Sequence, residues 1–182
     1  ILASISVGYA LYRNKKVPEN DRWTLSVEFF RQAFLERARE KATRESTLRF
    51  LVVKKTSSRP KPVPLRDEPN YESHLQLEDL LEAALTQHAE RIELAGADNE
   101  VAVQFVIDGV SYRQQPIPGP EGLRMIDYLK AEAGLDVQDR RRKQSGSVKV
   151  DTGPNGLHML RVMTAGSTRG IVCTIEIDRE QQ

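Results

Sequence analysis

The sequence has few of the residues that carry redox, metal and base-stacking chemistry. It contains one cysteine among 182 residues, Cys173, so no disulfide can form within the chain and a thiolate metal site is not expected. The three histidines, His74, His88 and His158, are far apart in the sequence and lack the spacing of metal ligands. Aromatic residues make up only 6% of the chain, which argues against nucleic-acid binding through stacked bases.

Motifs of nucleotide chemistry are also missing. The sequence has no GxxxxGK(S/T) loop to cradle phosphates and no GxGxxG turn. Its carboxylates are numerous but scattered, as on a solvated acidic surface, and Cys173 lies in a β-rich run where a buried, unreactive thiol is usual. We therefore predict that this chain alone is not an enzyme and that it has no catalytic residue, no metal site and no bound cofactor.

Charge is distributed unevenly along the chain. Residues 1–70 contain 15 basic and 8 acidic side chains, whereas residues 71–182 contain 12 basic and 18 acidic ones. A basic segment joined to an acidic one indicates that the first part meets an anionic surface, either lipid headgroups or nucleic acid.

The beginning of the chain has the pattern of a membrane-adjacent segment. Residues 1–12 are nearly uncharged, and basic residues follow within residues 13–16. Because a bilayer-spanning helix needs roughly 20 apolar residues, we interpret this run as the last turns of a transmembrane helix with its basic end in the cytoplasm. A packed N-terminal helix is the alternative. Residues 21–46 predict an amphipathic helix over a local core. We assign residues 1–56 to a membrane-adjacent helical arm, with membrane contact through residues 1–16.

A proline-rich segment separates this arm from the rest of the chain. Four prolines occur between residues 60 and 69, and alternate prolines favour extended polyproline II backbone. Residues 57–73 are therefore interpreted as a semi-rigid linker, and residues 74–182 as one folded domain.

The periodicity of this domain switches between helix and strand. Apolar residues recur at helical spacing over residues 74–89, where His88 extends the apolar stripe and is expected to be packed. A second helix is predicted over residues 123–133, with Gly134 placed to end it. The residues of this helix that are spaced to dock on the sheet are Leu123, Ile126, Leu129 and Lys130. The Asp-Gly pair at 108–109 is typical of a type I′ hairpin turn. We expect an α+β fold, a helix-covered antiparallel sheet like a PAS sandwich, preceded by the helical arm. Strands are expected at residues 91–95, 101–107, 110–114, 148–151, 157–164 and 171–177.

The most concentrated charge in the chain is the run RRRK at residues 140–143. Four adjacent cations repel one another and require anions nearby, either protein carboxylates or phosphates, and the forked guanidinium suits bidentate phosphate contact. A solvated or inter-domain surface is the ordinary interpretation. A phosphate-binding or nucleic-acid-binding module is the functional alternative, but no aromatic residue interleaves with the run, so nucleic acid is not the expected partner.

Four stretches carry a resemblance to a known family, in the same order as in that family. They are LEDLLEAALTQHAERIEL, VQFVIDGV, MIDYLKAEAGLDVQDRRRKQSG and HMLRVMTAGSTRGIVCTIEID. The second resembles an R-Y-R-x-D-G-V hairpin, the third a helix followed by L-D-I-x-E-R-R-x-P-Q-D-G-R, and the fourth a strand pair that contains R-V-S-T. Together, residues 77–178 resemble the second N-terminal domain of type II secretion and type IV pilus assembly ATPases.

The resemblance implies a non-catalytic assembly or regulatory domain that packs on a neighbouring subunit of a hexameric motor. ATP and Mg²⁺ would then belong to the motor of the intact protein, of which this chain, beginning with Ile1 and not Met, is expected to be a piece. The implied partners are that motor and the inner-membrane platform of the machine, at the cytoplasmic face of a bacterial inner membrane. By residue, the implied nucleotide-phosphate or inter-subunit contacts are Arg140, Arg141, Gln144, Gly146 and Arg161.

The sequence also departs from the family pattern. Ser147 stands where the last arginine of Q-D-G-R is expected, and Lys143 replaces a proline. Loss of that arginine removes one phosphate contact, which favours a scaffold over a nucleotide sensor. The alternative function is a stand-alone adaptor, or a phosphate- or nucleic-acid-binding module that uses residues 140–143.

Overall fold

The computed structural model describes residues 49–51, 61–97, 99–153 and 156–179. All of them belong to a compact unit that runs from Ala42 to Gln182. The predicted membrane contact through residues 1–16 and the predicted helix at residues 21–46 lie outside the described residues.

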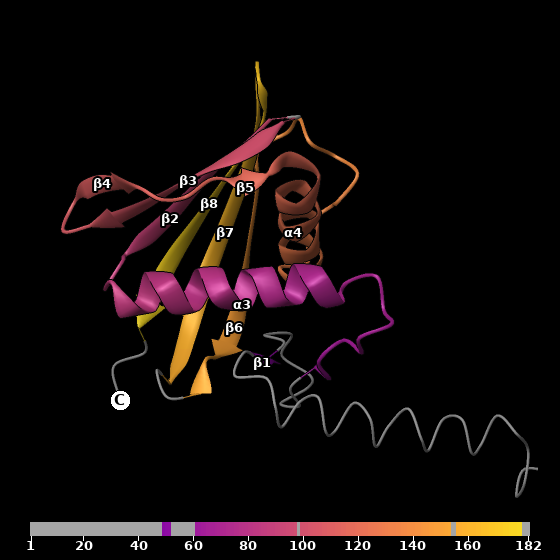
Figure 1. The fold of residues 1–182 in the computed structure, drawn as a ribbon, viewed down its shortest axis with the longest axis vertical. Coiled ribbons are helices and arrows are strands. Elements are labelled where there is room, and N and C mark those ends of the chain that lie inside the picture. The colour runs from indigo at the N-terminus through magenta and orange to yellow at the C-terminus, as the bar shows by residue number, and fades with distance from the viewer. Residues whose placement is uncertain (1–48, 52–60, 98, 154–155, 180–182) are drawn as a thin grey trace, which may run out of the picture. The chain divides into compact units, whose positions relative to one another are not determined.

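The domain is built on one antiparallel sheet (Figure 1). Its strands lie in the order β1-β6-β7-β8-β2-β3-β4, and β5 pairs with β3 beyond the end of β4. Strand β1 lies at one edge next to β6, and β2, β3 and β4 form the other half of the sheet. The later strands β6, β7 and β8 lie between them, with β8 next to β2. The strands are β1 Arg49–Leu51, β2 Arg91–Gly96, β3 Glu100–Ile107, β4 Val110–Arg113, β5 Ile117–Pro118, β6 Gln144–Asp151, β7 Leu157–Ser167 and β8 Gly170–Arg179.

Two helices in the described part of the chain, α3 (Tyr71–Thr86) and α4 (Gly119–Glu132), lie on the same side of this sheet (Figure 1). Strand residues that alternate toward the helices, such as Leu94 and Phe105, are buried against helix residues such as Leu81. Burying each such side chain stabilises the fold by roughly 1.5–3 kcal/mol. Neither helix is long and apolar enough to span a membrane. The predicted α+β class with a helix-covered antiparallel sheet is confirmed.

The predicted hairpin turn and helix end are confirmed by the backbone. Asp108 and Gly109 have φ values of 50° and 76°, and a type I′ turn requires positive φ at both positions. Gly134 has φ of 73° directly after α4. The N–H of Leu135 donates to the carbonyl of Lys130 at 2.8 Å, and that of Gly134 donates to Ala131 at 3.2 Å. This is the Schellman pattern, which satisfies the last carbonyls of a helix.

The prediction for His88 was wrong, because its side chain is exposed and not packed. Helix α3 ends at Thr86 with the same hydrogen-bond pattern as α4, from His88 N to Leu85 O and from Ala89 N to Ala84 O. His88 occupies the left-handed position of that turn, with φ of 59°, and is thereby carried away from the apolar face. Ala89, 2% exposed, joins the core instead.

Both helices begin earlier than the periodicity predicted. Helix α3 begins at Tyr71 and α4 at Gly119, ahead of the expected residues 74 and 123. At α4 Pro118 is the N-cap and Pro120 lies in the first turn. Proline is tolerated there because the first N–H groups of a helix have no intrahelical acceptor, so the missing N–H of proline costs no hydrogen bond. The second half of the proline-rich segment also packs on the domain, since Val63 and Leu65 are buried.

The turn after α4 gives a direct test of backbone conformation. Replacing Gly134 with alanine adds a Cβ that meets no atom within 4 Å, so only the left-handed backbone penalty remains. We expect Gly134→Ala to lower the free energy of unfolding by about 1 kcal/mol, measured by urea denaturation. Gly134→Asn should cost less, because asparagine tolerates this conformation. Equal losses for both variants would contradict the assignment.

Candidate functional site

The run of four cations lies in the loop that joins α4 to β6, residues 134–143, which we call the basic loop. Two of its cations are paired with carboxylates. Arg140 forms an ion pair with Asp127 on α4, and Arg142 forms one with Asp139 inside the loop. For two of the four cations, the nearby anions that we expected from the sequence are therefore protein carboxylates.

The other two cations are Arg141 and Lys143. Both side chains are exposed, and neither forms an ion pair with any described residue. They are the charges that the basic loop can offer to a partner, because the guanidinium groups of Arg140 and Arg142 already face carboxylates.

Asp139 shapes the turn that presents these cations. Its carboxylate accepts hydrogen bonds from the backbone N–H groups of Arg141 at 2.9 Å and Arg142 at 3.0 Å. The pKa of this carboxyl is held well below its usual range, first by the N–H of Arg142, then by that of Arg141 and by the Arg142 side chain. Aspartate commonly bonds its own backbone two residues on, so this turn has a local sequence signal that charge counting overlooks.

Lys130 holds the basic loop from within the protein. Its side chain is completely buried, and Nζ donates to the carbonyl oxygen of Asp139 at 2.7 Å. A buried ammonium without a hydrogen-bond partner costs free energy. The hydrogen bond from Lys130 therefore holds the carbonyl of Asp139 in place. Burial raises the pKa of the nearby Cys173 thiol to about 12, and the charge of Lys130 acts in the opposite direction. The thiol is therefore unreactive, as predicted.

Gln144 closes the basic loop at the start of β6. Its Oε1 accepts from the N–H of Asp136 at 2.8 Å, and its Nε2 donates to the carbonyls of Asp136 at 3.0 Å and Asp139 at 2.8 Å. The side-chain amide of Gln144 thus satisfies backbone groups of the loop that have no strand partner, because the loop is not part of the sheet. Gln144 acts on the loop conformation and is itself half-buried.

Two glycines let the basic loop lie directly on the sheet. A Cβ at Gly146 of β6 would collide with the carbonyl oxygen of Ala133 and lie 2.9 Å from the side chain of Leu135. A Cβ at Gly166 of β7 would lie 2.9 Å from the backbone of Arg141, to which the Gly166 N–H donates at 3.2 Å. Close backbone approach therefore explains both glycines. Gly146 came from the family resemblance, whereas Gly166 was not singled out from the sequence.

Arg161 is not brought together with the basic loop. It lies on β7 between the buried residues Leu160 and Val162, so its side chain projects from the face opposite the helices. There its Nη1 lies 3.5 Å from Oε2 of Glu176. Ser147 is the register partner of Arg161 on β6 and belongs to the same face. Of the five candidate residues, the basic loop and its supports therefore include four.

A second polar cluster is buried between the two helices. His74 Nδ1 lies 3.1 Å from the Tyr128 hydroxyl, and its Nε2 lies 3.9 Å from a Glu78 carboxylate oxygen. Burial lowers the pKa of His74, and the Glu78 charge acts against that shift. Next to this pair is a cavity of about 170 Å³, where Lys61 and Glu132 form an ion pair at 2.9 Å. Among the described residues, no group of three or more His, Cys, Asp or Glu side chains is arranged to hold a metal ion.

Comparison with known proteins gives a partial similarity. No family model matches the chain. The chain is similar to the competence protein ComGA of Halalkalibacterium halodurans, with 37% identity over 77 residues, which is 42% of this chain and 22% of that protein. The match thus spans about a fifth of the length of the curated relative. This similarity supports, at most, the resemblance to secretion and pilus assembly ATPases.

The role of Lys130 predicts a local effect of its removal. We expect Lys130→Met to change the free energy of unfolding by less than about 2 kcal/mol, because an apolar side chain of similar size fills the space. It should speed trypsin cleavage after residues 140–143 by about tenfold, because the loop loses a charged hydrogen bond. Lys61→Met removes an exposed ion pair elsewhere and serves as the control. Unchanged cleavage in Lys130→Met would refute the anchoring role.

The buried histidine predicts a dependence of stability on pH. The pKa of His74 is lowered from its ordinary value of 6.5 in the folded state, so the unfolded chain binds more protons below that pH. The contribution of neutral His74 is complete above pH 6.5 and is lost as the pH falls through 6.5 toward the lower folded pKa. We expect urea unfolding to show a steeper loss of stability between pH 7.5 and 5.5 in the natural chain than in His74→Gln. Parallel curves would rule out this linkage.

Proposed function

We propose that this chain is a non-catalytic assembly or regulatory domain of a type II secretion or type IV pilus assembly ATPase, and that its basic loop packs on a neighbouring subunit of the hexameric motor. The observation that carries the proposal is a firmly held loop with two free cations, Arg141 and Lys143. The ordered motif resemblance and the partial similarity to ComGA support the family.

The way the loop is held favours a docking role. Binding a partner costs the entropy of ordering the side chains and loops at the contact. Here the backbone of the basic loop is already fixed by Lys130, Asp139 and Gln144, so only the two free side chains remain to be ordered. A loop fixed in this way suits a protein surface of defined shape.

The alternative, a stand-alone phosphate- or nucleic-acid-binding module, has less support. Two of the four cations already face Asp127 and Asp139, which halves the charge available for phosphates. The basic loop also contains no aromatic residue on which a base could stack. ATP and Mg²⁺ accordingly belong, in this proposal, to the motor of the intact protein, at the cytoplasmic face of the inner membrane and next to the platform of the machine.

The proposal is tested on the intact gene product. We expect that protein to hydrolyse ATP, and Arg141→Glu to lower its turnover several-fold without changing its melting temperature, because the reversed charge repels the surface that the loop contacts. Arg66→Glu reverses an exposed charge outside the basic loop and serves as the matched control. An intact protein without ATPase activity, or equal turnover in the two variants, would remove the proposal.

A further inference from the structure

A groove lies between α3 and the segment that follows β4. It has a volume of about 430 Å³, and its floor includes the buried side chains of Val103 and Phe105. The remaining apolar lining comes from both walls and includes Leu80 and Ala83 of α3 and Ile117 of β5. An open groove of this size, with an apolar floor, can accept large side chains of a partner.

The groove is acidic. Asp79 of α3 and Glu121 of α4 line it, and no lysine or arginine among the described residues does. Gln76 donates to the Glu121 carboxylate at 3.2 Å, which keeps that carboxylate at the groove. An apolar floor with carboxylates above it suits a side chain that has an apolar stem and a cationic end, which describes arginine and lysine.

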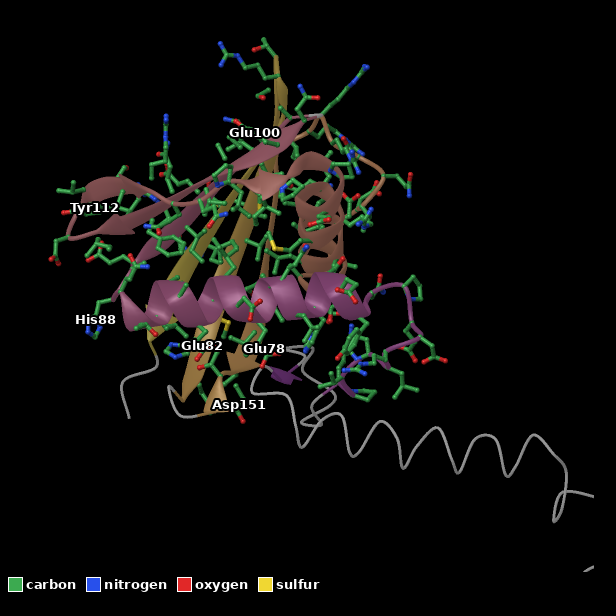
Figure 2. The ribbon with its side chains drawn as sticks, in the orientation of Figure 1. Glu78, Glu82, His88, Glu100, Tyr112 and Asp151 are labelled. Carbon is green, nitrogen blue, oxygen red and sulfur yellow. The ribbon has the colours of Figure 1, made fainter. Side chains whose placement is uncertain are left out.

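The β3-β4 hairpin extends the apolar floor beyond the helices. Tyr112 and Val110 are 49% and 53% exposed. Their register partners are Phe105 and Ile107, so both belong to the face of the sheet that carries the groove. Figure 2 shows Tyr112 on this hairpin, beyond the part of the sheet that α3 covers. A partner in the groove therefore also meets an exposed aromatic side chain, a residue type enriched at binding surfaces.

Helix α4 separates this groove from the basic loop. Glu121 faces the groove, whereas Lys130 holds the loop. These residues are nine positions apart, which at about 100° per residue places them on opposite sides of the helix. Arg141 and Lys143 therefore lie on one side of α4, and the acidic groove lies on the other. With the two surfaces on opposite sides, the cations of one copy can face the groove of the next.

We propose that the acidic groove binds Arg141 and Lys143 of a second copy of this chain. The inference rests on the proposed function, which places copies side by side in a ring. The two surfaces differ, so the contact is head to tail and can repeat from copy to copy. Two cations meet two carboxylates over an apolar floor, and the contact is small. It is therefore weak between free chains and strengthened where an assembly raises the effective concentration.

Covalent trapping detects such a weak contact. Ala83 is exposed at the groove, and Ser145 is exposed two residues after Lys143, so a cysteine at Ser145 leaves both cations in place. In the full 182-residue chain, we expect Ala83→Cys with Ser145→Cys to give a ladder of dimers, trimers and larger species with a short bismaleimide. Each single variant should stay monomeric, and a mixture of the two should stop at dimers. Cys173 is buried and does not compete. No ladder, or equal products from a single variant, would overturn the proposal.

Charge reversal identifies the groove as the receiving surface. Adding Asp79→Lys and Glu121→Lys to the cross-linking pair should reduce the ladder at least about fivefold, and added salt should act in the same direction. Glu82→Lys is the matched control, because Glu82 is exposed on α3 but does not line the groove (Figure 2). Ala83→Cys with the reversed groove, mixed with Ser145→Cys carrying Arg141→Glu and Lys143→Glu, should form dimers again. Equal loss with Glu82→Lys, or no recovery, would refute the pairing.

The intact protein separates failure of this inference from failure of the proposed function. If Arg141→Glu lowers ATP turnover while the reversed groove leaves turnover and cross-linking unchanged, the loop contacts a different surface of the neighbour and only the inference is wrong. If the intact protein has no ATPase activity, the proposed function is wrong. A ladder in the chain alone would still establish the contact between copies.

Discussion

The arrangement of the basic loop depends on one buried charge. Lys130 is part of the helix face that packs on the sheet, yet it ends in an ammonium with no access to water. The energetic cost of that burial is offset by the carbonyl oxygen of Asp139, which also accepts a hydrogen bond from Gln144. The backbone of the loop is thus drawn toward the core at its middle, and its charged side chains are left pointing outward.

That constraint explains how a run of like charges is tolerated on a short loop. Four adjacent cations repel one another unless anions lie nearby. Here Asp127 and Asp139 neutralise alternate members of the run, and the Asp139 turn fixes the backbone between them. The result is a surface of two exposed cations whose backbone position is set by the core. Such a surface can distinguish one protein partner from another, which a flexible polycation does not do.

Most of the fold could be predicted from local sequence patterns. Most of the site could not, because it depends on contacts between residues that are far apart in the sequence. Alternation in residues 101–107 was sufficient to predict β3, and the Asp-Gly pair and Gly134 were recognised because their backbone requirements are local. Helical spacing placed Lys130 on the face of α4 that docks on the sheet, and it is buried there. Its role in holding the loop had no local signal, because the partner of its ammonium is a carbonyl nine residues away. His88 misled because it continued the apolar spacing past the true end of α3.

Contacts that depend on folding also explain the rest of the site. Gly166 and the basic loop are separated by about 25 positions, and nothing near either of them in the sequence indicates that they touch. The atoms nearest Gly166 are backbone atoms of Arg140 and Arg141, whereas the side chains of Arg141 and Lys143 are exposed. Substitutions at Arg141 and Lys143 can therefore alter the charge of this surface without changing the backbone contact between the loop and the sheet. Mutation, in evolution or by design, can therefore change which partners bind this edge of the domain while the fold stays the same.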